Sequence, residues 1–295
     1  MALRAVLGFA YTFLPVVMVP LYIRIVYIFL THKTYRSNQS YRVMAHIGLL
    51  HIGMFPGYTL YGISVCVTND FWGLPTFFMK IVNWFRKIEG ILCVALAYDR
   101  FRAIFDIRER PYLIYAITVL SWIYGTIYFG LLLSPLADFY VDPVGIKVTY
   151  NRTLPTTRIM DKVTIVLAAV TASVNFVLHV AIVVKLVLEK RSIQVVESKF
   201  REKIILLQAF LKFLGDLWVT FLAHVIIIFM ERTTFIGILT GCGYEVNYLV
   251  FPPLMYILVS RTLRADVFEF LRRNRVREEQ VFQSRGQQAG IPRQG

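Results

Sequence analysis

Charged side chains interrupt the long apolar stretches of this 295-residue chain, where few charges are expected. One stretch carries Lys80, Asn83, Arg86, Lys87 and Glu89. Because Lys80, Asn83 and Lys87 recur at spacings of three and four residues, they share one face of a helix. A charge inside an apolar helix is costly unless it is paired or meets a ligand, so this face indicates a binding site.

Two later apolar stretches add further polar residues, and Lys212 and Asp216 stand four apart on one of them. We therefore predict eight candidate ligand-binding residues: Asn83, Arg86, Lys87, Glu89, Asp216, His224, Tyr244 and Glu245. A structural alternative remains, in which Arg86 pairs with Glu89 and Lys212 pairs with Asp216. The stretch that contains Glu89 carries three cations, Lys80, Arg86 and Lys87. An anionic or strongly polar ligand is therefore favoured over a cation.

The sequence carries no signature of catalysis. It has no phosphate-binding glycine loop, no Gly-x-Ser-x-Gly and no paired carboxylates. The five histidines include no pair three or four residues apart, and Cys66, Cys93 and Cys242 are too few for a metal cluster. We therefore predict a protein that is not an enzyme and needs neither a cofactor nor a metal.

Composition and hydropathy indicate an all-α membrane protein. Hydrophobic residues make up 57% and charged residues 17% of the chain, against about 25% charged in soluble domains. Seven apolar runs reach the ~20 residues that a bilayer-spanning helix needs. They are Val6–Leu30, Tyr41–Val65, Thr76–Tyr98, Tyr112–Leu136, Val163–Leu188, Ile204–Met230 and Ile236–Val259. Residues 1–275 are thus predicted to form one seven-transmembrane domain, and residues 276–295 a disordered cytoplasmic tail.

The basic residues predict the orientation in the membrane. With the amino terminus outside, nineteen Lys and Arg lie in the inner loops and tail, against five outside. The glycosylation sequon at Asn151 then lies outside, whereas a second sequon at Asn38 lies inside. The net charge of +14 comes from short basic stretches between apolar runs. It therefore favours contact with membrane lipids and argues against nucleic acid.

Two short motifs lie near the inner ends of the third and seventh predicted helices. Asp99, Arg100 and Phe101 end the third helix, and Pro253-Leu254-Met255-Tyr256 lies in the seventh. Both resemble motifs of the rhodopsin-like G-protein-coupled receptors. The resemblance implies that Arg100 locks against the sixth helix in the inactive state and meets the G protein once that helix moves outward.

Each motif also has a local explanation. Asp99 and Arg100 can be interfacial charges at a helix end, where no charge need be buried. Pro252 and Pro253 remove two backbone donors and predict a kink, either a hinge or a static bend. Tyr256 can equally be an interfacial anchor.

The stretch Ser260–Arg275 has apolar residues at helical spacing and predicts a short amphipathic helix, about 261–274, on the inner leaflet. It resembles the eighth helix of the same receptors. Four features depart from their pattern: the outer loop Ala137–Asp161 lacks a cysteine, His51 stands where the second helix of these receptors has a sodium-binding acid, Pro252 replaces an asparagine, and Trp218 lacks the usual following proline.

The short amino terminus, the short loops, Tyr41-Arg42-Val43-Met44 and Cys66 resemble the divergent nematode serpentine chemoreceptors. This resemblance implies a plasma-membrane chemosensory receptor that binds an extracellular small molecule and activates a heterotrimeric G protein. Two alternatives remain. A transporter or channel would use the intramembrane charges as a conduction path, and a non-signalling receptor-like protein would serve as an assembly partner.

Overall fold

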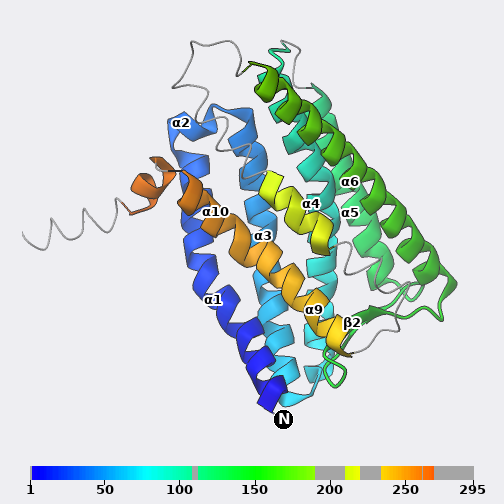
Figure 1. Cartoon of the computed structure of the whole chain (residues 1–295). Coiled ribbons are helices and arrows are strands. Elements are labelled where there is room, and N and C mark those ends of the chain that lie inside the picture. Colours follow the sequence, from blue (N-terminus) through cyan, green and yellow to red (C-terminus); the bar gives the residue numbers. More distant parts are fainter. Residues whose placement is uncertain (1, 108–111, 190–209, 220–233, 261, 269–295) are drawn as a thin grey trace, which may run out of the picture.

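The computed structural model describes residues 2–107, 112–189, 210–219, 234–260 and 262–268, which form a bundle of long helices (Figure 1). The first five predicted spans correspond to α1 (Ala2–Thr31), α3 (Gln39–Val67), α4 (Leu74–Ile104), α5 (Tyr112–Leu133) and α6 (Pro155–Glu189). Residues 210–219 are helical and belong to the sixth predicted span. The seventh consists of α9 (Thr234–Glu245), the π-helical turn η3 (Val246–Val250) and α10 (Phe251–Val259).

Several helices differ in length from the predicted spans. The α4 and α6 helices have 31 and 35 residues, because a hydropathy window finds only the apolar centre of a helix that continues into the aqueous interface. The α5 helix stops at Leu133 instead of Leu136. Pro135 explains this early end, since a proline disfavours the helical conformation of the residue before it.

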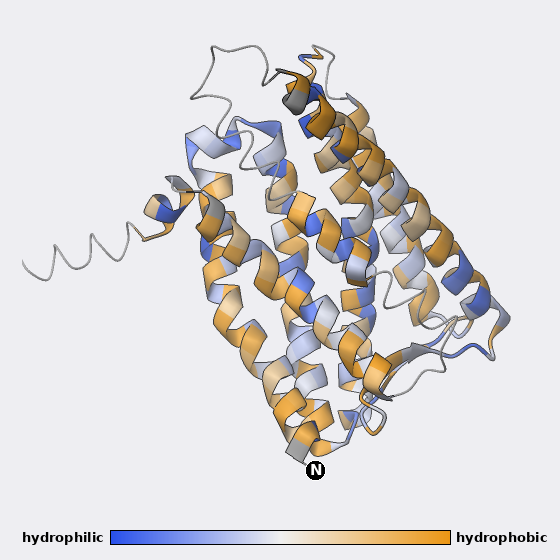
Figure 2. Ribbon diagram, viewed as in Figure 1, coloured by the Kyte–Doolittle hydropathy of each residue, from blue (hydrophilic) through white to orange (hydrophobic). Residues whose placement is uncertain are grey.

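Among the described residues, four helices are long and apolar enough to cross a membrane by themselves: Leu3–Thr31, Gln39–Val67, Tyr112–Leu133 and Pro155–Lys185. Figure 2 shows that α1 and α6 are mostly apolar along their length. A fifth span results if Thr234–Leu258 is counted together with the bent segment Thr262–Phe268. The α4 helix stands apart because it carries the charged residues from Lys80 to Glu89.

Glycines allow α1 and α3 to pack backbone against backbone. A Cβ on Gly62 would lie 2.7 Å from the carbonyl oxygen of Gly8 and 2.8 Å from the backbone nitrogen of Thr12. Small residues at such crossings bring membrane helices close enough for extensive van der Waals contact. This contact holds α1 directly against α3.

A β-hairpin closes one end of the bundle, where the sequence predicted only a loop. Its strands β1 (Phe139–Asp142) and β2 (Lys147–Tyr150) pair antiparallel. The backbone nitrogen of Val141 donates to Thr76 Oγ1 at 3.0 Å, and Lys80 Nζ lies 3.6 Å from Asp138 Oδ1. These contacts attach the hairpin to the start of α4 without a disulfide, since all three cysteines are free. We call this the hairpin end.

The other end of the bundle carries α2 (Lys33–Arg36) and the helical segment Thr262–Phe268 (Figure 1). This segment is inclined by 106° to the helix Thr234–Leu258. Leu263 and Val267 are buried in a cluster with Phe29 and Tyr256. The apolar face of the predicted amphipathic helix therefore packs on the bundle itself. The rest of that helix and the tail 276–295 lie outside the described residues.

Candidate functional site

A series of buried and half-buried polar side chains crosses the centre of the bundle, beginning at Glu89 on α4. Glu89 is 1% exposed, and its Oε1 lies 2.7 Å from His51 Nε2 and 3.1 Å from Lys212 Nζ. The opposite ring nitrogen of His51, Nδ1, lies 2.7 Å from Tyr22 Oη. His51 thus lies between the Glu89 carboxylate and the Tyr22 hydroxyl, one on each ring nitrogen.

This series of polar contacts continues from Lys212 toward the seventh span. Lys212 Nζ lies 2.7 Å from Asp216 Oδ1, and Asn247 Nδ2 donates to the same oxygen at 2.6 Å. Lys212 Nζ also lies 4.5 Å from the centre of the Tyr248 ring. We call this set the central relay: Tyr22, His51, Glu89, Lys212, Asp216 and Asn247. It joins α1, α3, α4, the sixth span and η3 through direct polar contacts.

The relay settles the pairing alternatives left by the sequence. The predicted Lys212–Asp216 pair is confirmed, whereas the Arg86–Glu89 pair is wrong. Glu89 is instead paired across helices, and the Arg86 guanidinium carbon lies 3.3 Å from the centre of the Tyr244 ring. Sequence reasoning left His51 out of the site, although a histidine inside an apolar run was a usable signal.

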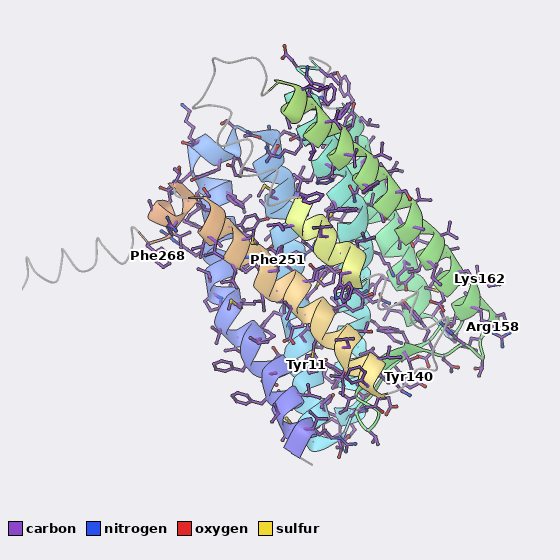
Figure 3. All side chains as sticks on the ribbon, in the orientation of Figure 1. Tyr11, Tyr140, Arg158, Lys162, Phe251 and Phe268 are labelled. Carbon is purple, nitrogen blue, oxygen red and sulfur yellow. The ribbon has the colours of Figure 1, made fainter. Side chains whose placement is uncertain are left out.

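A cavity of about 1010 Å³, part of it open to the outside, lies between the relay and the hairpin. We call it the outer cavity. Four of the predicted residues line it: Asn83, Arg86, Lys87 and Tyr244. The hairpin contributes Lys147 and Tyr150, and α1 contributes Tyr11, which Figure 3 labels on the part of α1 nearer the hairpin end. Sequence reasoning missed these three residues, because only the fold brings the hairpin and α1 together with α4 around one cavity.

Hydrogen bonds hold one wall of the outer cavity in place. Asn83 Nδ2 donates to Tyr128 Oη at 3.1 Å and to Tyr150 Oη at 2.6 Å. The two tyrosine hydroxyls also hydrogen-bond to each other. Desolvation raises the pKa of the Tyr150 hydroxyl, so it stays protonated and remains able to donate. Asn83 thereby positions aromatic side chains from α5 and the hairpin.

Two further cavities flank the relay. A middle cavity of about 820 Å³ shares Arg86, Lys87 and Tyr244 with the outer cavity and reaches Glu89 and Asp216. An inner cavity of about 680 Å³ lies on the other side of the relay, where His51, Lys212 and Tyr256 line it. A change in the outer cavity can thus reach the relay through residues that two cavities share.

Two of the predicted ligand residues do not join this arrangement. Glu245 is 1% exposed and does not line any of the three cavities as the described residues define them. His224 lies outside the described residues. Within the described segments, no group of three His, Cys, Asp or Glu side chains is arranged to hold a metal ion.

The predicted switch residues at the end opposite the hairpin are more buried than expected. Arg100 is only 5% exposed, and its Nη2 lies 3.9 Å from Met44 Sδ. Asp99 is 9% exposed and accepts a hydrogen bond from Ser40 Oγ. The prediction that Arg100 occupies an unburied interfacial position is therefore wrong, because α3 covers it. The ring of Phe101 packs against that of Phe105 in a tilted arrangement, with ring centres 4.3 Å apart.

The predicted lock between Arg100 and the sixth helix involves the inner part of that span. Residues 204–209 there lie outside the described residues.

The seventh span is irregular before its two prolines and not at them. Pro252 and Pro253 lack the N–H groups that would bond to the carbonyls of Tyr248 and Leu249, and the π-helical turn η3 occupies this region. Tyr256 is 9% exposed, with its ring 5.5 Å from Phe29. It belongs to the core of the bundle, so the interfacial-anchor alternative is wrong.

Comparison with known proteins identifies the fold of the chain. No protein-family model and no curated protein matches the sequence. The structure is similar to squid rhodopsin, with a TM-score of 0.74 at 12% sequence identity, over 91% of this chain and 85% of that chain. The chain therefore has the rhodopsin-like fold, a seven-helix membrane bundle with a short amphipathic eighth helix, and is a multi-pass membrane protein.

Proposed function

We propose that the chain is a G-protein-coupled receptor that binds an extracellular small molecule in the outer cavity and activates a heterotrimeric G protein. The ion pair between Glu89 on α4 and Lys212 on the sixth span carries this proposal. Arg86 and Lys87 line the outer cavity within one turn of Glu89. A ligand held by these cations therefore acts beside the contact that ties α4 to the sixth span.

Activation follows if the ligand prefers one arrangement of that contact. A ligand shifts a conformational equilibrium only by its difference in affinity for the two states. With Arg86 and Lys87 drawn toward a ligand, α4 moves relative to Lys212, and the sixth span is released from Glu89. At the opposite end, Arg100 under α3 then becomes available to a G protein, the role that the Asp99-Arg100-Phe101 motif implies.

The proposal includes a location and a biological class. The charge asymmetry of the loops supports an extracellular amino terminus in the plasma membrane, with the hairpin end outside. The short loops and the Tyr41-Arg42-Val43-Met44 segment support a chemosensory role of the nematode serpentine type. Membrane lipids are the surrounding partner, and Asn151 is the proposed glycosylation site.

Nucleotide exchange in nanodiscs tests the proposal. Purified protein with a panel of G proteins and candidate odorants should accelerate GTPγS binding, and Arg100→Ala should abolish the acceleration. Arg102→Ala is the matched control, since it removes an arginine at the same helix end outside the motif, and it should keep the activity. A folded wild-type protein that accelerates exchange on no G protein would refute the proposal and favour a non-signalling partner.

A further inference from the structure

The outer cavity carries two cations that no carboxylate neutralises. Neither Arg86 nor Lys87 forms an ion pair with any residue that the structure describes, and both line the outer and middle cavities. Arg86 rests on the Tyr244 ring, and Lys87 Nζ lies 5.3 Å from the centre of the Tyr128 ring. Aromatic faces attract cations but do not cancel their charge.

Two acidic groups near these cations, Glu89 and Asp161, are already engaged. Glu89 is bound by His51 and Lys212. Asp161, which lines the outer cavity, accepts from Arg152 Nη2 at 2.6 Å. Leaving a buried charge uncompensated is strongly unfavourable. Glu89 and Asp161 therefore leave both Arg86 and Lys87 without a paired carboxylate.

The rest of the cavity lining suits a ligand whose uncharged part is aromatic or apolar. Five tyrosines contribute rings and hydroxyls: Tyr11, Tyr58, Tyr61, Tyr150 and Tyr244. Phe139 and Met79 add apolar surface, and Lys147 on β2 adds a third cation, 3.6 Å from Asp142. Ligand sites commonly combine such apolar walls with a few placed charges.

We infer that the outer cavity binds a water-soluble organic anion, an aromatic carboxylate or a compound of the same charge and shape. Arg86 and Lys87 bind the anionic group, and the tyrosine rings enclose the body. This inference rests on the proposed function for its biological meaning, but binding can be measured without any G protein.

Thermal unfolding in nanodiscs of uncharged lipid measures that binding. The probes are phenylacetate and indole-3-acetate, with phenylacetamide and phenethylamine as neutral and cationic counterparts. The carboxylates should raise the unfolding temperature of the wild type in a concentration-dependent way, and the counterparts should not. Stabilisation by the amide or the amine equal to that by the acids would overturn the inference, as would no stabilisation by either acid.

Lys87→Gln separates a ligand contact from a structural role. Without ligand it should unfold at the same or a higher temperature, since it removes a half-buried charge that no carboxylate pairs with. Its affinity for the carboxylates should fall by roughly 10- to 100-fold, the loss expected for one charge-assisted hydrogen bond. Lys80→Gln is the matched control on the same helix face, because Lys80 pairs with Asp138 and does not line the cavity, and it should bind normally. Equal losses in both variants would contradict the assignment.

The binding and exchange assays can fail independently. Carboxylate binding without nucleotide exchange would leave the ligand assignment standing and refute the receptor proposal. Exchange driven only by neutral or cationic odorants, with no carboxylate binding, would leave the receptor standing and refute the ligand assignment.

Discussion

At the scale of single residues, Lys212 is the junction of the central relay. Its ammonium group lies within 3.1 Å of Glu89 and 2.7 Å of Asp216. A buried carboxylate, Glu89, and a half-buried one, Asp216, therefore share one cation from different helices. Removing Lys212 would leave the buried Glu89 carboxylate with His51 as its remaining ionic partner. The loss of one partner from a buried ion pair costs more than the pair itself contributes.

Replacing Lys212 should accordingly destabilise the fold. We expect Lys212→Met to lower the free energy of unfolding by about 3–5 kcal/mol, the range for removing one partner of a buried ion pair. Chemical denaturation in detergent micelles measures it. Lys80→Met is the comparison, because its pair with Asp138 is partly exposed and contributes about 0–1 kcal/mol. Similar losses in the two variants would show that the relay is not a buried charge network.

The sequence predicted which residues are polar and buried, but not their partners. Helical periodicity placed Lys212 and Asp216 together correctly, since that contact is local. The same local rule paired Arg86 with Glu89 and was wrong, because His51 and Lys212 approach Glu89 from other helices. Tertiary contacts of this kind depend on how α3, α4 and the sixth span are arranged, which no local spacing encodes.

At the scale of the helices, the α1–α3 contact depends on the absence of side chains. Gly62→Ala would place a methyl group 2.7 Å from the Gly8 carbonyl, closer than packed atoms tolerate. The backbones must then separate along the crossing, and we expect a loss of about 1–3 kcal/mol, as in overpacked cores. The unfolding temperature of the purified variant reports it.

Gly130→Ala provides the control, since a Cβ on Gly130 meets nothing within 4 Å. This variant should gain about 0.5–1 kcal/mol from the higher helix propensity of alanine. If Gly62→Ala were as stable as Gly130→Ala, the close crossing of α1 and α3 would not exist in the membrane.

The helical elements were predictable to different degrees for physical reasons. Apolar length identifies a membrane span, because a lipid-exposed backbone must satisfy its own hydrogen bonds. It does not mark where a helix ends in water, so α4 and α6 extend beyond the predicted spans. The hairpin was missed because β1 and β2 have four residues each. Such short strands are held by Thr76 and Asn83 on α4 more than by their own pattern.

At the scale of the whole molecule, the rhodopsin-like arrangement was predictable from seven apolar runs and two motifs, although the identity to squid rhodopsin is only 12%. A bundle of this kind tolerates wide variation in sequence, since membrane helices associate through shape and a few polar contacts. The outer cavity was less predictable. It requires the hairpin, α1 and α9 to meet around Arg86 and Lys87.

Glycosylation tests the orientation of this whole arrangement. The hairpin end carries Asn151, whose Oδ1 accepts from Thr153 Oγ1 at 2.6 Å within the sequon. The opposite end carries Asn38, which caps α3 by accepting from the backbone nitrogen of Ser40. Only one end can face the glycosylation machinery. With the hairpin outside, protein expressed in insect cells should show an endoglycosidase-sensitive mass shift that Asn151→Gln removes and Asn38→Gln leaves intact. A shift that depends on Asn38 would place the outer cavity on the cytoplasmic side, where an extracellular ligand could not reach it.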